Sequence, residues 1–311
     1  MKALRLQESS PRPLLVEQEI ARPELSNGEV LVRVRAVAVT PSELLWYPTT
    51  HNKDGSPRTH AVPGHEFSGE IAEIGEGVAE FSPGEDVYGM NDWFAEGALA
   101  EYCVTRPEWI APKPNGLSHE EAASVPISAL TAWQGLLIRG RLRPGEHVLV
   151  HGGAGAVGLF AVQIAKMTGA HVTTTVSALD AAFVKEFGAD DVIDYRAMKF
   201  EDRVRDVDLV FDTVGGDTLQ RSWRVLKHGG RMVTIAADSE SSTGDERVKQ
   251  AFFIVEPNSA QLRDIAGLLE SGKLRFTVDT VLPISAASEA YAGRSARHGH
   301  GKLVISASEW Q

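Results

Sequence analysis

With 311 residues, the chain exceeds the usual size of one domain, and 43% hydrophobic with 23% charged residues are typical of a soluble globular protein with two packed lobes. Its formal net charge of −11 disfavours nucleic acid and anionic membranes as partners, because binding to phosphate polyanions depends on clustered Lys and Arg. The single cysteine, Cys103, excludes an internal disulfide, and the lack of a signal-like apolar start or of roughly 18 consecutive apolar residues predicts a soluble, cytoplasmic protein.

The first third of the chain is predicted to form a β-rich lobe. Residues 30–39 carry apolar side chains at every second position, with Arg33 and Arg35 on the other face, as in a half-buried strand. Further short strands are predicted at residues 67–74, 86–88 and 100–104. Ser118, followed three residues later by Glu121, has the pattern of a capping box, so a helix should begin there and mark the end of the lobe.

Beyond residue 121, strand and helix patterns alternate. Strands are predicted at residues 147–150, 171–176, 208–211 and 231–235, with a helix at residues 157–167. Because such alternation requires crossover connections, it predicts a parallel sheet with helices on its faces, the Rossmann architecture. Residues 239–245 are predicted to be a polar loop, and strands at 276–282 and 302–306 should rejoin the first lobe. The predicted domains are therefore 1–121, 122–274 and 275–311.

A glycine-rich run follows the predicted strand that ends at Val150. In HGGAGAVG, residues 151–158, Gly153, Gly155 and Gly158 have the G-x-G-x-x-G spacing of a dinucleotide-binding loop. The first glycine would permit the tight turn, the second the approach of a pyrophosphate, and the third close packing of the next helix, whose N-terminus would face the phosphates. A glycine-rich turn that binds nothing is the alternative, but the position between a strand and a helix favours the cofactor loop.

The end of the second predicted strand bears on the choice between NADPH and NADH. Proteins that bind NAD usually place an acidic residue about 20 residues after the glycine loop, where it binds the ribose 2′-hydroxyl. Here that strand ends in TTVS, residues 174–177, which favours NADPH with Ser177 as a hydrogen-bond donor. Neither Lys nor Arg follows immediately, and the nearby Asp180 counts against a 2′-phosphate, so NADH is the less favoured alternative.

Motifs spread over nearly the whole chain resemble those of one known family. The resemblance is carried by GHEFSGEI at residues 64–71, ALTAW at 129–133, DYR at 194–196, FDTVGG at 211–216 and GKLV at 301–304. They are similar to the zinc-independent, quinone oxidoreductase-like (zeta-crystallin-like) branch of the medium-chain dehydrogenase/reductase superfamily. The resemblance implies an α/β fold with a GroES-like β-barrel lobe, built from the N-terminal third and the C-terminal tail, and a doubly wound Rossmann lobe. It also implies a homodimer.

The resemblance further implies roles for individual residues. The cofactor-binding set would be Thr131, Gly153, Ala154, Gly155, Ala156, Val157, Gly158, Ser177, Tyr195, Val214, Phe253, Ile254 and Lys302. Thr40 would lie near the nicotinamide, and with Tyr47 it forms the expected catalytic set. Trp46 and Trp93 are expected to be aromatic walls suited to a flat acceptor. The alternative is that these aromatic residues belong to the ordinary core or surface.

The same resemblance raises the question of zinc. His65 stands where zinc-dependent relatives place a metal ligand, but the other two ligand sites fall on Thr40 and near Ile127, and one ligand of three cannot hold a catalytic zinc. A four-cysteine structural zinc is excluded because residues 97–109 contain only Cys103. We therefore expect no metal, and we interpret His65 and Glu66 as hydrogen-bonded polar residues at a turn.

Without a metal to polarise an oxygen, reduction of an electron-poor acceptor is favoured over oxidation of a plain alcohol. The sequence therefore predicts an NADPH-dependent reductase that transfers hydride to a small quinone or a conjugated enone or enal. Two alternatives remain open at this point: a non-enzymatic NADPH-binding or structural protein, and an enoyl-thioester reductase.

Overall fold

The computed structural model describes residues 1–7, 14–236 and 245–310. The chain divides into two compact units: unit 1 comprises Met1–Ile127, Pro257–Lys273 and Thr277–Gln311, and unit 2 comprises Ser128–Glu256 and Leu274–Phe276. Among the described residues, unit 1 contains a seven-stranded sheet and a two-stranded sheet, and unit 2 contains a five-stranded sheet. Within the described ranges, no helix combines the length and the apolar composition needed to cross a bilayer.

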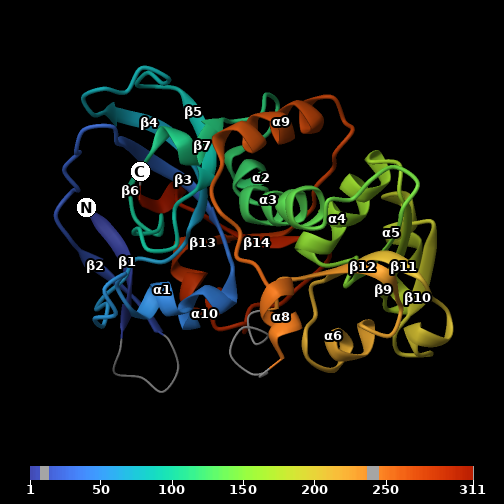
Figure 1. Ribbon diagram of the computed structural model, residues 1–311. Coiled ribbons are helices and arrows are strands. Elements are labelled where there is room, and N and C mark those ends of the chain that lie inside the picture. The colour runs from blue at the N-terminus through green and yellow to red at the C-terminus, as the bar shows by residue number, and fades with distance from the viewer. Residues whose placement is uncertain (8–13, 237–244, 311) are drawn as a thin grey trace. The chain divides into compact units, whose positions relative to one another are not determined.

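The larger sheet of unit 1 is built around one long strand, β3 (Val30–Ala38), which pairs antiparallel with β4 (Glu66–Ile74), β6 (Tyr102–Thr105) and β14 (Lys302–Ser306). The strand order is β13-β14-β3-β4-β5-β7. The remaining strands are β5 (Asp86–Met90), β7 (Ile110–Pro112) and β13 (Val278–Pro283). The chain's last strand thus returns to its first third, as Figure 1 shows for β3 and β14.

The predicted alternation of β3 is found in the middle of the strand but not at its ends, where Leu31 and Val37 are also buried. Val30, Val32 and Val34 are buried, whereas Arg33 is exposed on the opposite face. The predicted capping box is also present: the Ser118 side chain accepts from the Glu121 amide, and α2 (His119–Ala123) follows. The antiparallel pair β1 (Lys2–Gln7) and β2 (Leu14–Glu19) was not predicted, and neither were the short strands Ile110–Pro112 and Asp191–Asp194.

The sheet of unit 2 is entirely parallel, in the order β10-β9-β8-β11-β12. Its strands are β8 (His147–His151), β9 (His171–Val176), β10 (Asp191–Asp194), β11 (Val207–Asp212) and β12 (Leu226–Thr234). The helices between and beside them include α4 (Ala156–Met167), α5 (Ala181–Glu186), α6 (Gly216–Ser222) and α8 (Glu246–Ala251). This parallel arrangement confirms the predicted Rossmann architecture. Apart from Asp245, the predicted polar loop at 239–245 lies outside the described residues.

The two units differ from the predicted domains at the first boundary and in the placement of one helix. The boundary at residue 121 falls at Ile127, and α9 (Ser259–Glu270), predicted within 122–274, groups with unit 1. A buried hydrogen bond explains the difference, because the Tyr88 hydroxyl on β5 donates to the Leu262 carbonyl at 2.6 Å. Along the chain, α3 (Pro126–Trp133) crosses from unit 1 into unit 2, and the π-helix Gln134–Arg139 follows within unit 2.

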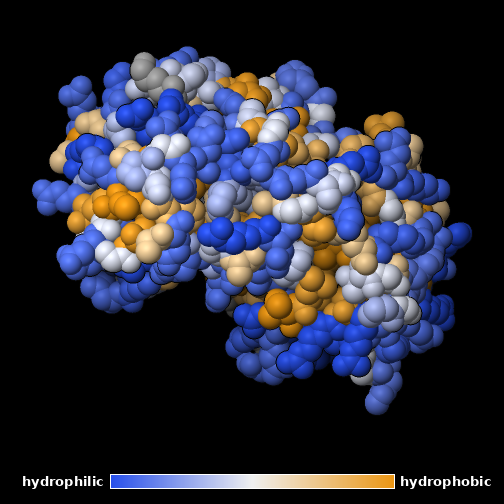
Figure 2. Space-filling view, turned by 90° about the horizontal axis from the view of Figure 1, so that it is seen from above, coloured by the Kyte–Doolittle hydropathy of each residue, from blue (hydrophilic) through white to orange (hydrophobic). Residues whose placement is uncertain are grey.

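The surface is chemically mixed. Figure 2 shows a face on which hydrophilic residues predominate and hydrophobic ones gather in separate patches. Scattered apolar residues of this kind are usual on globular proteins and do not by themselves mark a binding site. A binding site is therefore to be recognised by cavities and buried contacts rather than by surface hydropathy.

Candidate functional site

The glycine loop at the end of β8 depends on two positions where a side chain would not fit. Gly152 has a φ of +75°, so Gly152 makes the tight turn that the spacing assigned to Gly153. A Cβ on Gly153 would lie 2.1 Å from Thr174 Oγ1, which leaves room for hydrogen only. The predicted turn residue was therefore wrong by one position. The physical reason is that Gly153 faces the neighbouring strand β9, whereas Gly152 reverses the chain.

The third glycine of the spacing brings helix α4 against the loop. A Cβ on Gly158 would lie 2.1 Å from the Gly152 carbonyl oxygen, so helix and loop approach each other backbone to backbone. α4 begins at Ala156 after Gly155, and no side chain caps it. Because the first N–H groups of a helix have no partner within the helix, this end can bind an anion such as a pyrophosphate.

A cavity of about 840 Å³ lies over this loop within unit 2. Five of the predicted cofactor residues line it: Ala154, Gly155, Ser177, Tyr195 and Val214. Tyr195 and Val214 expose 56% and 54% of their surface, so both present apolar area that a planar base could cover. The structure thus brings together residues that follow β8, β9, β10 and β11, as expected where the carboxyl ends of parallel strands meet.

The cavity wall beyond β10 contains two cations that the sequence analysis missed. Arg196 and Lys199 line the same cavity as Ser177, and both are exposed. We expected any basic residue for the 2′-phosphate to follow Ser177 directly in the chain. Because β10 lies beside β9 in the sheet, the residues just after β10 reach the same edge. The DYR motif already contained Arg196, although only its tyrosine was singled out. The Ser177 hydroxyl donates to Asp180 Oδ2 at 2.6 Å, so its donor capacity is directed inside the protein.

His151 is a buried residue of this site that was not predicted. Its Nδ1 lies 3.0 Å from Thr175 Oγ1 and its Nε2 lies 2.9 Å from Ser222 Oγ, and its ring contacts Phe200 edge-on. Burial lowers the pKa of His151 to about 3. A neutral imidazole therefore connects β8, β9 and α6 directly beneath the glycine loop.

The remaining predicted cofactor residues lie outside the lining of this cavity. Thr131 is buried in α3, and Phe253 is buried with its amide bonded to the Thr234 carbonyl, whereas Ile254 is 44% exposed. Gly153, Ala156, Val157 and Gly158 form the loop and the first turn of α4. Thr40, Tyr47 and Lys302 belong to unit 1.

The aromatic residues predicted for the acceptor pocket pack in two pairs in unit 1. Tyr47 is 55% exposed, and its ring stacks on His51 with centroids 4.4 Å apart. Trp46 and Trp93 are 4.6 Å apart and nearly perpendicular, with Trp93 buried. The two tryptophans therefore present one edge-to-face cluster rather than two parallel walls.

Thr40 and Lys302 lie in a buried polar cluster of unit 1. The Lys302 ammonium forms an ion pair with Glu66 Oε1 and donates to Thr40 Oγ1 at 3.2 Å, while Glu66 Oε2 accepts from the Ile127 amide at 2.9 Å. Burial lowers the pKa of Lys302, and the carboxylate of Glu43 opposes that shift. Lys302 is only 8% exposed, so its ammonium is directed into the protein.

His65 is held on both sides of its ring. Nδ1 lies 3.4 Å from Glu43 Oε1, and Nε2 lies 3.3 Å from the Ala95 carbonyl oxygen. Both neighbours are acceptors, and a neutral imidazole has a single N–H, so that form can donate to only one of them. Throughout the part of the chain that the structure describes, no three His, Cys, Asp or Glu residues group in a way that could hold a metal ion.

Comparisons with known proteins agree with this architecture. Residues 26–115 match the alcohol dehydrogenase GroES-like domain, and residues 187–305 match a family described as zinc-binding dehydrogenase. The chain is 34% identical to a probable mitochondrial zinc-binding oxidoreductase of Arthroderma benhamiae, covering 91% of this chain and 89% of that protein. It is 30% identical to a chloroplastic NADPH-dependent alkenal/one oxidoreductase of Arabidopsis thaliana, covering 94% and 75%.

A solved structure is similar over almost its whole length. The quinone oxidoreductase from Coxiella burnetii has a TM-score of 0.86 and 30% identity, and the match covers 98% of this chain and 99% of that one. A GroES-like unit, a parallel Rossmann sheet and a glycine loop at the end of its first strand define a two-domain dehydrogenase/reductase. The chain belongs to the medium-chain dehydrogenase/reductase superfamily, in its quinone oxidoreductase-like branch.

Replacing Gly158 by Ala tests the glycine cradle. The added Cβ would meet the Gly152 carbonyl and push α4 away from the loop, so we expect NADPH to bind at least roughly tenfold more weakly by calorimetry. Gly267→Ala in α9, where a Cβ meets nothing within 4 Å, is the matched control and should leave binding unchanged. Unaltered NADPH affinity in Gly158→Ala would contradict the cradle.

The buried imidazole of His151 predicts a pH dependence of stability. Because its pKa in the folded state is about 3, against 6.5 for the free side chain, the unfolded chain binds more protons between these values. The free energy of unfolding should therefore fall as the pH falls through this window, by up to about 1.4 kcal/mol per pH unit from this residue. Urea unfolding at several pH values should show a shallower dependence in His151→Gln. Equal slopes in the two proteins would show that His151 is not the titrating group.

Proposed function

We propose that the protein is an NADPH-dependent reductase of small quinones or conjugated enones and enals, and that it works without zinc. That it is an NAD(P)H-dependent oxidoreductase follows from its family. The preference for NADPH, the acceptor class and the independence of metal are the parts proposed. The observation that carries the proposal is the cavity of about 840 Å³ over the glycine loop, at which the uncapped N-terminus of α4 is held by the backbone packing of Gly158 on Gly152.

The chain's own residues fit a dinucleotide. The uncapped N-terminus of α4 suits the pyrophosphate, and the cavity beside Ser177, Tyr195 and Val214 suits the adenosine part. When bound, the nicotinamide would supply a hydride, which is the chemistry that the protein itself lacks. The protein's contribution is then to hold the nucleotide in one orientation and to keep a hydrogen-bond donor near the acceptor oxygen.

NADPH is favoured over NADH by charge. Arg196 and Lys199 add two positive charges to the cavity wall, against Asp180 and Asp202. Arg221 also lines the cavity, but it is paired with Glu201 and Asp217 at 2.7 Å each. A 2′-phosphate beside Arg196 and Lys199 would gain charge-assisted hydrogen bonds that a 2′-hydroxyl cannot form to the same extent.

The proposal of metal-free reduction is supported by the contacts around Glu66. Thr40 stands at the cysteine ligand position of zinc-dependent relatives, and a hydroxyl in place of a thiolate is a poor zinc ligand. Glu66 and Thr40 are joined to Lys302, so an ammonium group already neutralises the buried carboxylate. An ammonium can donate a hydrogen bond but offers no open coordination position, which favours acceptors that are already electron-poor.

Steady-state assays test this function. Purified protein mixed with NADPH and a panel of quinones, enones and enals should oxidise the cofactor, and an added chelator should leave the rate unchanged. Loss of all turnover on chelation would overturn metal independence. If NADPH quenches the protein's fluorescence but no acceptor oxidises the NADPH, a non-enzymatic binding protein is favoured. A strong preference for acyl thioesters would favour an enoyl-thioester reductase.

The basis of NADPH preference is tested by Arg196→Ala and Lys199→Ala. Each should lower kcat/KM for NADPH by roughly tenfold and leave NADH nearly unchanged, since only the phosphorylated ribose loses a charge-assisted hydrogen bond. Arg203→Ala, at an exposed position in the same unit outside the cavity, is the control. Parallel losses for NADPH and NADH would exclude a contact specific to the 2′-phosphate.

A further inference from the structure

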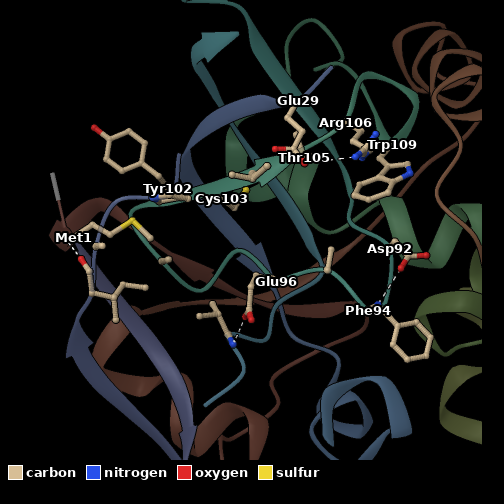
Figure 3. A pocket seen from close by; sticks show the side chains of 18 of the residues that line it. Met1, Glu29, Asp92, Phe94, Glu96, Tyr102, Cys103, Thr105, Arg106 and Trp109 are labelled. Carbon is tan, nitrogen blue, oxygen red and sulfur yellow. Dashed lines mark hydrogen bonds and ion pairs between the residues drawn. The ribbon is translucent and has the colours of Figure 1, made fainter. Parts of the chain in front are cut away.

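A second cavity, of about 600 Å³, lies entirely within unit 1. Figure 3 shows it between Met1 and Tyr102 on one side and Trp109, Asp92 and Phe94 on the other. It shares no residue with the cavity over the glycine loop. Its volume falls within the range of small-molecule sites, and the proposed reductase activity does not use it.

The carboxylates in its wall are already satisfied by the protein. Each of the three has one cationic partner and one backbone amide. Glu29 pairs with Arg106 at 3.5 Å and accepts from the Ser26 amide, and Asp92 pairs with Lys53 at 3.6 Å and accepts from the Phe94 amide. Glu96 pairs with Arg58 at 3.1 Å and accepts from the Val62 amide at 2.6 Å. A cationic ligand would therefore have to displace a partner that is already in place.

An anionic ligand is disfavoured by the same wall. Three acidic residues line the cavity, Glu29, Asp92 and Glu96, against two basic ones, Lys53 and Arg106. Both basic groups are engaged in the ion pairs just described, and each also lies over an aromatic ring of the wall, Arg106 over Trp109 and Lys53 over Phe94. A nucleotide phosphate would meet only cations that are already engaged, including the Met1 ammonium, which donates to the Ile20 carbonyl, so this cavity differs in chemistry from the one that contains Arg196 and Lys199.

Apart from the hydroxyl groups of Tyr102 and Thr105, the rest of the wall is apolar. Ile20, Val62, Ala100 and Val104 contribute aliphatic surface. Cys103 also lines the cavity, and burial raises the pKa of its thiol far above the usual range, so it behaves as a small apolar group rather than as a nucleophile. An uncharged ring compound would gain from covering this surface without disturbing the paired charges.

We propose that the unit 1 cavity binds an uncharged, predominantly apolar ring compound, at a site separate from the nucleotide site. The proposal does not depend on the proposed reductase activity, because binding can be measured without turnover. The occupant is defined by three properties: no net charge, apolar surface for the aliphatic wall, and a compact ring that leaves Arg106 and Lys53 in place over Trp109 and Phe94.

The test uses 2-naphthol, which is uncharged at neutral pH and does not accept hydride. Isothermal titration of the protein saturated with NADPH should show one saturable site for 2-naphthol. The anion 2-naphthoate, of similar size, should bind at least roughly tenfold more weakly, because its charge would face an acidic wall without a free cation. No saturable binding of 2-naphthol, or equal affinities for the two compounds, would overturn the proposal.

Two variants locate the site. Val104→Phe places a larger side chain in the cavity from strand β6, and Ala21→Trp does so from an exposed position at its rim. Each should weaken 2-naphthol binding by at least roughly tenfold without changing the affinity for NADPH. Ala79→Trp, the same substitution at an exposed alanine of unit 1 outside the cavity, is the matched control.

Folding of the variants is checked by circular dichroism and by NADPH titration, and Ala21→Trp keeps the test valid if Val104→Phe fails to fold. Unchanged 2-naphthol affinity in a folded Ala21→Trp or Val104→Phe would place the ligand elsewhere and refute the site. Displacement of 2-naphthol by NADPH would also refute it, since the two cavities share no residue.

Discussion

The proposed nucleotide site depends on the close approach of two backbone segments, the loop after β8 and the first turn of α4. At Gly153 and Gly158 a Cβ would lie 2.1 Å from its nearest neighbour, so contact at this distance exists only without side chains. That contact sets the direction of α4 and the place of its uncapped N-terminus, whereas the buried His151 beneath the loop is held by Thr175 and Ser222. The sheet supplies a rigid support, but the glycines decide whether a phosphate can reach the helix end.

Elements whose sequence pattern is local were predicted well. The strand over residues 30–39, the capping box at Ser118 and the parallel strands of the second lobe depend on periodicity, turn residues and caps that a short window contains. The position of the tight turn, at Gly152 rather than Gly153, could not be derived from the spacing. The spacing begins at Gly153, but the positive φ lies one residue earlier at Gly152, and Gly153 packs against Thr174 instead.

Features that depend on neighbours in the sheet could not be found in the same way. Arg196 joins Ser177 because β10 lies beside β9, although 18 intervening residues separate the two positions in the chain. The grouping of α9 with unit 1 depends on the buried hydrogen bond from Tyr88 to the Leu262 carbonyl, and no local pattern contains both residues. The charge pairs around the unit 1 cavity likewise combine residues from well-separated segments, such as Glu29 with Arg106.

Charge pairing distinguishes the sites of this molecule more clearly than their shape does. The nucleotide cavity contains exposed cations beside an uncapped helix end, which suits a phosphorylated ligand. In the unit 1 cavity, every acidic group of the wall is paired with both a cation and an amide, which suits an uncharged ligand.

The buried carboxylate of Glu66 is also paired. Solvent does not reach it, and the Lys302 ammonium balances its charge. Since a buried carboxylate needs such a partner, substituting Lys302 alone would leave Glu66 uncompensated, and the two residues form one unit in the energetics of the fold. Under the proposed function, this ion pair confines the chemistry to acceptors that need no metal, because its cation is already engaged by the protein.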